Sequence, residues 1–439
     1  MENYSIVIFI LALMIGLSAM AGKIRVPYPI LLITAGIAVG FIPEMPQFEI
    51  NSEVVFLIFL PPLLYDAAFN IDYKTFRTQI NTISGLAIGL VFLTTVAIAA
   101  VAHYCIPGMD WPLAFVLGAI LSATDAVAAI GITKGLGLSH KTTTILEGES
   151  LINDASALVA YRFAVAAVTG VSFAFFKASL QFLGLMAGGV LVGFVMGKLL
   201  AFILQRVKKD AMVTISFMLL MPFVTYRLAE ELHLSGVIAV VMLGLVISQF
   251  STRVFPEELK RQSRSIWDII IFLLNGLIFI LIGLQFPYVL AHIGRDQVLP
   301  YLGYALLITV VALLVRMFRV FGQRTNLQKG FARLSNSAAT GRGKGKRRMR
   351  ITEEELLDLE TSIIISWSGM RGIVSLAIAI GLPATLDNGL EFPMRNDIIF
   401  ISVAVVLFTL LGQGLTLPWL VKKLKNKRIG PVETIGSHS

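Results

Sequence analysis

Residues 112–131 read PLAFVLGAILSATDAVAAIG, and this stretch decides the class of protein. A helix that crosses the apolar core of a bilayer needs about 20 mostly apolar residues, which is the length of this stretch. Its only charged residue, Asp125, lies toward the second half. A charge at the bilayer centre costs about 2.5–3.5 kcal/mol and is by default a sign of function. The stretch therefore predicts a membrane helix that carries a functional acid.

Similar apolar stretches recur along the whole chain. Of its 439 residues 56% are hydrophobic and only 14% are charged, whereas a soluble domain has about a quarter charged residues. The sequence predicts an all-α polytopic membrane protein with about thirteen spans. They cover residues 5–21, 28–41, 52–69, 80–104, 112–131, 143–167, 176–204, 210–228, 235–250, 265–287, 298–318, 361–382 and 397–421. The first is expected to be a retained helix, because the basic residues Lys23 and Arg25 follow it rather than precede it.

The basic residues indicate the orientation of these spans. With the N-terminus outside, the inside loops hold 28 of the 36 Lys and Arg residues. The outside loops hold only Lys177, Arg295 and Arg395. Because basic residues favour cytoplasmic loops, we expect a multi-pass protein of the cell membrane whose C-terminus is cytoplasmic.

The longest inside loop, residues 319–360, contains the basic run GRGKGKRRMR at 341–350. We expect this run to contact anionic lipid headgroups rather than nucleic acid. The following ITEEELLDLE, residues 351–360, is expected to form a short surface helix. The single cysteine, Cys105, excludes a disulfide within the chain and a cysteine-based metal site. Since no HExxH or GxSxG motif occurs either, we expect neither an enzyme nor a cofactor.

Polar residues gather within three of the predicted spans. The fifth carries Thr124 and Asp125, the twelfth carries Arg371 between two glycines, and the sixth carries the segment EGESLIND at 147–154. Ser150 and Asp154 are four residues apart and face one way. A hydroxyl and a carboxylate one turn apart suit a hard, oxygen-liganded cation such as sodium.

The fifth and twelfth spans combine polar and small residues in mid-helix, which is typical of the broken helices of transporters. They are seven spans apart and so run in opposite directions, as in an inverted repeat. Several charges allow a simpler interpretation. Glu147 can lie at the inner interface, Glu149 and Arg371 can form a purely structural ion pair, and Arg162 can neutralise a buried acid or reach the outer surface.

Six motifs in order resemble the cation:proton antiporter-1 family, which includes bacterial NhaP-type antiporters and animal sodium/proton exchangers. They are FLIFLPPLLYDAAF (56–69), SATDAVAA (122–129), GESLINDASALVAY (148–161), AEELHLSGVIAVVMLGLVIS (229–248), WSGMRGIVSLAIA (367–379) and GQGLTLPWL (412–420). The resemblance implies a homodimer whose transport domain, residues 1–421, has two bundles. The core bundle would hold about 80–167 and 361–421, the dimerisation bundle about 5–69 and 176–318, with a short cytoplasmic tail at 422–439.

The resemblance also implies the cation site. Asp154 would be the essential acid that binds cation or proton and Asp125 the second acid, with Ser150 and the carbonyl of Thr124 as further ligands. Asp66 would be a third-span acid near the site, and Glu149 and Arg371 a pair that ties span six to span twelve.

Asn153 corresponds to the asparagine that sets this family apart from relatives with two consecutive aspartates. It implies electroneutral exchange of one cation for one proton. The family often has Asp-Pro where this chain has Asp125-Ala126, so the proline that would help to break span five is missing. The rivals are a K⁺-selective antiporter of the same fold and a cation channel, for which no repeated filter loop is found.

Overall fold

The computed structural model describes residues 3–24, 28–42, 56–133, 135–169, 175–207, 210–339, 356–386 and 389–428. These residues form helices and loops, with one isolated β-bridge between Thr385 and Glu391. The first half of the chain contains α1 (Asn3–Ile24), α2 (Tyr28–Gly40), α4 (Leu60–Asn70), α5 (Tyr73–Thr78), α6 (Ile80–Cys105), α7 (Trp111–Ser122), α8 (Ala126–Ile132), α9 (His140–Val168) and α10 (Phe175–Val207). The second half contains α11 (Ala211–Glu231), α12 (Gly236–Val254), α13 (Glu257–Ala291), α14 (Arg295–Ala339), α15 (Leu359–Trp367), α16 (Ile373–Ile380), α17 (Arg395–Thr409), the π-turn η2 (Leu410–Gly414) and α18 (Leu415–Arg428).

Within these described ranges, nine helical segments are long and apolar enough to cross a membrane, and three shorter apolar helices accompany them. Large apolar side chains point outward along them, as on α14, where Leu299 and Phe318 are 78% and 76% exposed. Such surfaces suit contact with lipid tails rather than water. The all-helical membrane fold is confirmed, while the count of thirteen spans stays a prediction.

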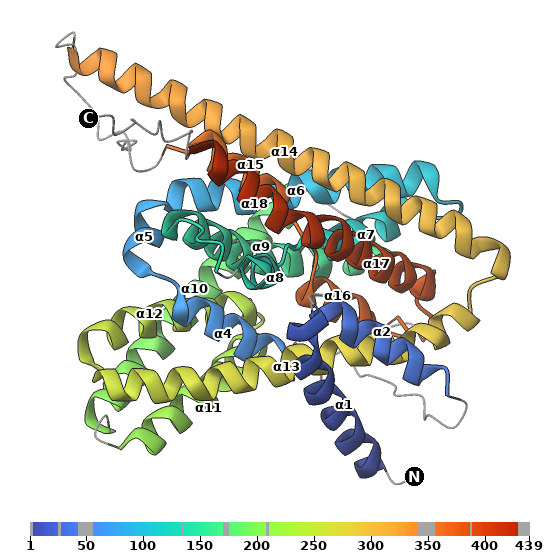
Figure 1. Cartoon of the computed structure of the whole chain (residues 1–439), viewed down its shortest axis with the longest axis horizontal. Coiled ribbons are helices and arrows are strands. Elements are labelled where there is room, and N and C mark those ends of the chain that lie inside the picture. Colours follow the sequence, from blue (N-terminus) through green and yellow to red (C-terminus); the bar gives the residue numbers. More distant parts are fainter. Residues whose placement is uncertain are drawn as a thin grey trace, which may run out of the picture.

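The helices pack in two groups, which Figure 1 shows as a lower and an upper part. In the lower part α12 packs against α4, α10 and α11, and α13 packs against α2. Gly189 and Gly193 of α10 make the approach to α12 close, because a Cβ at either would meet the backbone oxygens of Ser235 and Ala239. In the upper part α6, α7 and α9 contact one another, and α14 lies across α6, α15 and α17.

Two helices extend eight or more residues beyond one end of their predicted spans. Helix α13 begins at Glu257 rather than 265, and α14 continues to Ala339, 21 residues beyond the predicted end at 318. Hydropathy marks where a helix leaves the membrane, not where its hydrogen-bonded backbone ends. The basic run 341–350 and the first half of the expected surface helix, residues 351–355, lie outside the described residues. In the second half, 356–358 are not helical and 359–360 begin α15.

The position of α14 also bears on the predicted division of the chain. The family resemblance places residues 295–318 in the dimerisation bundle, together with the rest of 176–318. In the structure this helix packs against α6, α15 and α17, which lie in the predicted core ranges. Span eleven therefore contacts helices of the predicted core ranges, while the division into a core bundle and a dimerisation bundle stays a prediction.

Two spans are interrupted, as the sequence predicts. In span five, α7 ends at Ser122 and α8 begins at Ala126. In span twelve, α15 ends at Trp367 and α16 begins at Ile373. Each break leaves backbone donors and acceptors without their intrahelical partners, and the way these are satisfied builds the site.

Candidate functional site

The two breaks are joined to each other by their backbones. The amide of Asp125 donates to the carbonyl of Met370 at 2.8 Å, and Ser375 Oγ of α16 donates to the carbonyl of Ala123 at 3.3 Å. Groups released by one broken helix are thus paired with groups of the other. These hydrogen bonds fix the position of Asp125, although Asp125 lies between α7 and α8 and is not part of a helix.

Asp125 itself starts the second half of span five. Its Oδ1 accepts a hydrogen bond from the amide of Ala128 at 3.1 Å, so the acid is the N-cap of α8. This cap explains how the span breaks without the Asp-Pro of the family, since a side-chain acceptor replaces the missing helical bond. Gly372 is required beside it, because a Cβ there would overlap the Asp125 carboxylate. The acid therefore sits where α8 and α16 both begin.

Helix α9 positions the break from the other side. Ser150 Oγ donates to the carbonyl of Thr124 at 2.7 Å and accepts from the amide of Ala126 at 3.4 Å. Asn153 Nδ2 donates to Thr124 Oγ1 at 2.9 Å. The structure thus brings together four of the predicted site residues, Thr124, Asp125, Ser150 and Asn153, as contacts between span six and the break in span five.

Asp154 lies one turn beyond Ser150 on α9. Its Oδ1 is buried and has no hydrogen-bond partner among the described residues. The charged groups that act on it are two further acids, Asp125 and Glu149. A buried carboxylate oxygen without a donor is costly in its charged form. The arrangement therefore requires a positive ligand, either a proton on the carboxyl group or a bound cation.

The prediction that Glu149 pairs with Arg371 is wrong, because the partner of Glu149 is another arginine. Glu149 pairs with Arg316 of α14, whose Nη1 and Nη2 lie 2.5 and 2.9 Å from its two oxygens. Arg371 instead donates to the carbonyls of Gly369 and Leu121, at 2.7 and 3.0 Å. These carbonyls belong to the two broken spans. The guanidinium group of Arg371 therefore donates to backbone carbonyls that the breaks leave without helical partners.

Sequence reasoning did not assign Arg316 a role, although the signal was present. It is a lone basic residue in the apolar span 298–318, and the argument that singled out Arg371 applied to it equally. Its third donor, Nε, bonds the carbonyl of Ile365 at 2.8 Å. Gly369 makes room for it, since a Cβ there would overlap the Arg316 side chain. Arg316 therefore ties α14 to span six and to span twelve at once.

Asp66 belongs to a separate polar group. Its Oδ1 accepts from Asn70 Nδ2 at 2.6 Å, and Asn70 Oδ1 accepts from Arg264 of α13 at 2.6 Å. Glu147 is half-buried and interacts electrostatically with Arg264 and Asp66. The contacts of the described residues place Asp66 with this group and not with Asp125 or Asp154.

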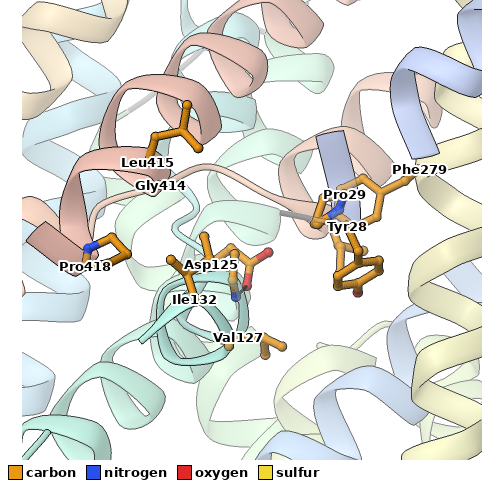
Figure 2. A pocket seen from close by; sticks show the side chains of 12 residues that line it. Tyr28, Pro29, Asp125, Val127, Ile132, Phe279, Gly414, Leu415 and Pro418 are labelled. Carbon is orange, nitrogen blue, oxygen red and sulfur yellow. Dashed lines mark hydrogen bonds between the residues drawn. The ribbon is translucent and has the colours of Figure 1, made fainter. Parts of the chain in front are cut away.

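A cavity of about 390 Å³ leads to the crossing. Figure 2 shows Tyr28, Pro29 and Phe279 on one side of Asp125 and Leu415 and Pro418 on the other. The cavity is thus formed between α2 and α13 on one side and α8 and the last span on the other. Asp125 is among the residues that line it and Asp154 is not, so a ligand from the cavity would meet Asp125 first.

Comparison with known proteins identifies the family. The model of the transmembrane sodium/hydrogen exchanger family matches residues 8–423. The chain belongs to this family. It is 31% identical over 434 residues to the Na⁺/H⁺ antiporter NhaH of Halobacillus aidingensis, covering 95% of this chain and 97% of that protein.

Two further proteins of the same kind are similar to this exchanger-family chain. A sodium, potassium, lithium and rubidium/H⁺ antiporter of Bacillus pumilus is 34% identical over 92% of this chain, which spans 59% of the length of that relative. The sodium proton antiporter MjNhaP1 of Methanocaldococcus jannaschii has the same fold, with a TM-score of 0.71, 20% identity, and 97% of this chain and 99% of that chain covered. The family resemblance of the six motifs is confirmed.

Proposed function

We propose that this protein exchanges a monovalent cation, most simply Na⁺, for protons across the cell membrane. The observation that carries the proposal is the buried Asp154 oxygen without a donor, placed beside Asp125 at the crossing of two broken helices. Relatives with printed activities support it, since they are Na⁺/H⁺ antiporters or accept sodium, potassium, lithium and rubidium. Potassium and lithium therefore remain candidate substrates beside sodium.

Coupling follows from the charge of the site. An empty, ionised carboxylate in a low-dielectric interior is strongly disfavoured, so the core moves readily only when Asp154 holds a proton or a cation. The two ligands compete for the same oxygens, and each crossing carries one or the other. Thr124 and Ser150 supply neutral oxygens that can replace part of the cation's water shell, while Asp125 adds a second carboxylate at the end of the cavity.

The stoichiometry proposed is one cation for one proton. Asn153 is neutral and its amide group is engaged with Thr124, so it adds no proton of its own. We propose further that the N-terminus lies outside, the C-terminus in the cytoplasm, and the cavity therefore on the cytoplasmic side. Two of its lining residues support this side, since Tyr28 follows the predicted inside loop 22–27 and Ile132 begins the predicted inside loop 132–142. We also propose that the protein is a homodimer in which each subunit has a core bundle and a dimerisation bundle.

The experiment is a flux assay on purified protein in proteoliposomes that enclose a pH-sensitive dye. The proteoliposomes are prepared with an acidic interior, and NaCl, KCl or LiCl is then added to the outside in separate runs. Exchange predicts that a transported cation raises the internal pH at a rate that saturates with its concentration. A cation conductance without proton movement would indicate a channel, and the absence of any response to all three salts would overturn the proposal.

A further inference from the structure

The last membrane span contains a π-turn whose role the site described above does not explain. Residues Leu410–Gly414 form η2 between α17 and α18. Single π-turns within α-helices are rare and are often found at functional sites, because the extra residue re-aims the side chains around it. Here Leu411 and Leu415 are 42% and 51% exposed, whereas Gln413 and Gly414 face the interior.

The interior face of this turn lies on the break in span twelve. Thr409 Oγ1, before the turn, accepts from the amide of Arg371 at 3.2 Å. Thr416 Oγ1, after it, accepts from Trp367 Nε1 at 2.9 Å. Between them, the position of a Cβ on Gly414 is 3.4 Å from the sulfur of Met370. Gln413 is therefore placed between contacts with the two ends of the unwound segment.

The amide group of Gln413 has no partner in this setting. The side chain is only 4% exposed, and neither its oxygen nor its nitrogen makes a hydrogen bond to a described residue. Buried polar groups in proteins are almost always paired, and those without a protein partner are commonly satisfied by internal water. The hydroxyls of Thr409 and Thr416 on the same span are both paired.

The cavity extends to the residues that follow Gln413 in the chain. The next two residues, Gly414 and Leu415, line it together with Asp125, and Gly414 has no side chain to close that wall. Met370, whose side-chain sulfur neighbours Gly414, is also the residue whose carbonyl accepts from the amide of Asp125. A water on Gln413 would thus lie beside the segment, Met370 and Arg371, whose backbone positions the acid.

We propose that Gln413 is a positioning residue that holds water at the crossing of the two broken helices. Through this water it supports the place of Asp125 and helps to replace the hydration shell of the arriving cation. Because ions of different size give up hydration water at different free-energy cost, Gln413 sets both the apparent affinity and the preference among Li⁺, Na⁺ and K⁺. The inference rests on the proposed exchange function.

The first test compares Gln413→Leu with the wild type in proteoliposomes. Leucine keeps a similar volume and removes both hydrogen-bonding atoms. We expect the half-saturating Na⁺ concentration to rise about tenfold. We also expect the half-saturating concentrations of Li⁺ and K⁺, each divided by that of Na⁺, to change at least threefold. Ser402→Ala is the matched control, because its hydroxyl is another buried group without a partner in the described structure and it lies in α17 of the same span. It should stay within twofold of the wild type.

The second test detects the water without transport. Radicals made from water by a brief X-ray pulse oxidise methionines next to bound water, even buried ones. Met370 and Met218 are both 0% exposed, and only Met370 neighbours Gly414. We expect Met370 to be oxidised several-fold faster than Met218 in the wild type, and this difference to disappear in Gln413→Leu.

The outcomes separate the two proposals. Wild-type protein that moves no protons in response to any salt contradicts the exchange function, whatever the labelling shows. An active wild type with unchanged affinity and cation preference in Gln413→Leu overturns the role of Gln413. So does oxidation of Met370 that is as slow as that of Met218, or that persists in Gln413→Leu, since the water would then be absent or held by the cavity alone.

Discussion

Glu149 on α9 accepts hydrogen bonds from both terminal nitrogens of Arg316 on α14, and the two side chains are 1% and 2% exposed. Two full charges at that depth are tolerated only as a pair. Arg371 lies within electrostatic range of both, but its own donors are used by backbone carbonyls. The pair therefore links span eleven to the helix that carries Asp154.

Removing one member of this pair should destabilise the protein strongly, because the other charge is left buried. We expect Arg316→Met or Glu149→Gln to cost about 3–5 kcal/mol. The double substitution should recover part of the loss. Thermal unfolding in detergent, analysed as a double-mutant cycle, checks this. Strictly additive losses would contradict the pairing of Glu149 with Arg316, and a larger coupling between Glu149 and Arg371 would favour Arg371 as the partner.

Asp154→Asn should abolish coupled exchange. An amide has the shape of the carboxyl group but can neither take up a proton nor neutralise a cation. Salt-driven proton flux in proteoliposomes is the measurement, with Asp268→Asn as control, an exposed acid of α13 paired to Arg264 on the same helix. Asp125→Asn should be similarly damaging. Normal flux in correctly folded Asp154→Asn protein would remove Asp154 from the site.

The exchange should be insensitive to membrane voltage. With Asn153 in place of a second acid, one proton for one cation moves no net charge. A charge crossing 100 mV is worth about 2.3 kcal/mol, close to a fifty-fold shift in the equilibrium ion ratio. We expect the Na⁺-driven reversal point to stay constant when potassium and valinomycin impose a voltage, provided K⁺ is not transported. A shift with voltage would mean that Asp66 or Glu147 releases a second proton.

Arg162 of α9 and Glu230 of α11 join the two helix groups at the end remote from the cavity, with Nη2 and Oε1 2.9 Å apart. The same oxygen accepts from the amide of Gly236 at 3.0 Å. If the core moves against the other helices during exchange, this contact must break. We expect Glu230→Gln to change the maximal exchange rate at least threefold while changing stability by less than about 1 kcal/mol, since partly exposed pairs contribute little.

A control within one helix is available for this pair. Arg227 and Glu231 form an i,i+4 ion pair on α11 that does not cross between the groups. Glu231→Gln should leave the rate unchanged. Equal effects of the two substitutions would argue against a link that opens during transport.

The carboxyl group of Asp72, between α4 and α6, should make the stability of the protein depend on pH. It caps α5 and accepts from Thr75 Oγ1 at 2.5 Å, and this bond together with the contact to His140 lowers its pKa from 3.8 to about 2. Because folding favours the ionised form, its contribution to stability is present above about pH 4 and is lost as the pH falls toward 2.

The variants Asp72→Asn and Asp72→Ala separate the charge from the cap. Asparagine keeps the cap but loses the charge, so it should be less stable than the wild type at pH 7, approach it as the pH falls toward 2 and show a flatter pH dependence between 4 and 2. Alanine loses the cap as well and should cost about a further 1 kcal/mol at pH 7. Unfolding midpoints measured from pH 5 to 2.5 check both. A wild-type and an Asp72→Asn curve of equal slope in that range would contradict the lowered pKa.

The class of protein and the positions of the polar residues in its spans could be predicted from local sequence. Apolar stretches of bilayer length, and single charges within them, carry that information locally, because a bilayer imposes the same requirement on every span. The break in span five could also be expected at Thr124 and Asp125, since small and polar residues in mid-span weaken a helix. The motifs in 148–161 and 367–379 pointed to the family that the comparisons confirm.

Which charged residues contact one another depends on how the helices pack. Arg316 and Arg371 look alike in sequence, each a lone arginine in an apolar span, and spacing within one helix says nothing about partners on another. The fold places Arg316 against Glu149 and gives Arg371 to the carbonyls freed by both breaks. It likewise decides that Asp125 caps α8 without a proline and that Gln413 turns inward at a π-turn. The contacts of Arg316 with Glu149 and of Arg371 with Leu121 join residues far apart in the chain, so their energies depend on packing that no local pattern records.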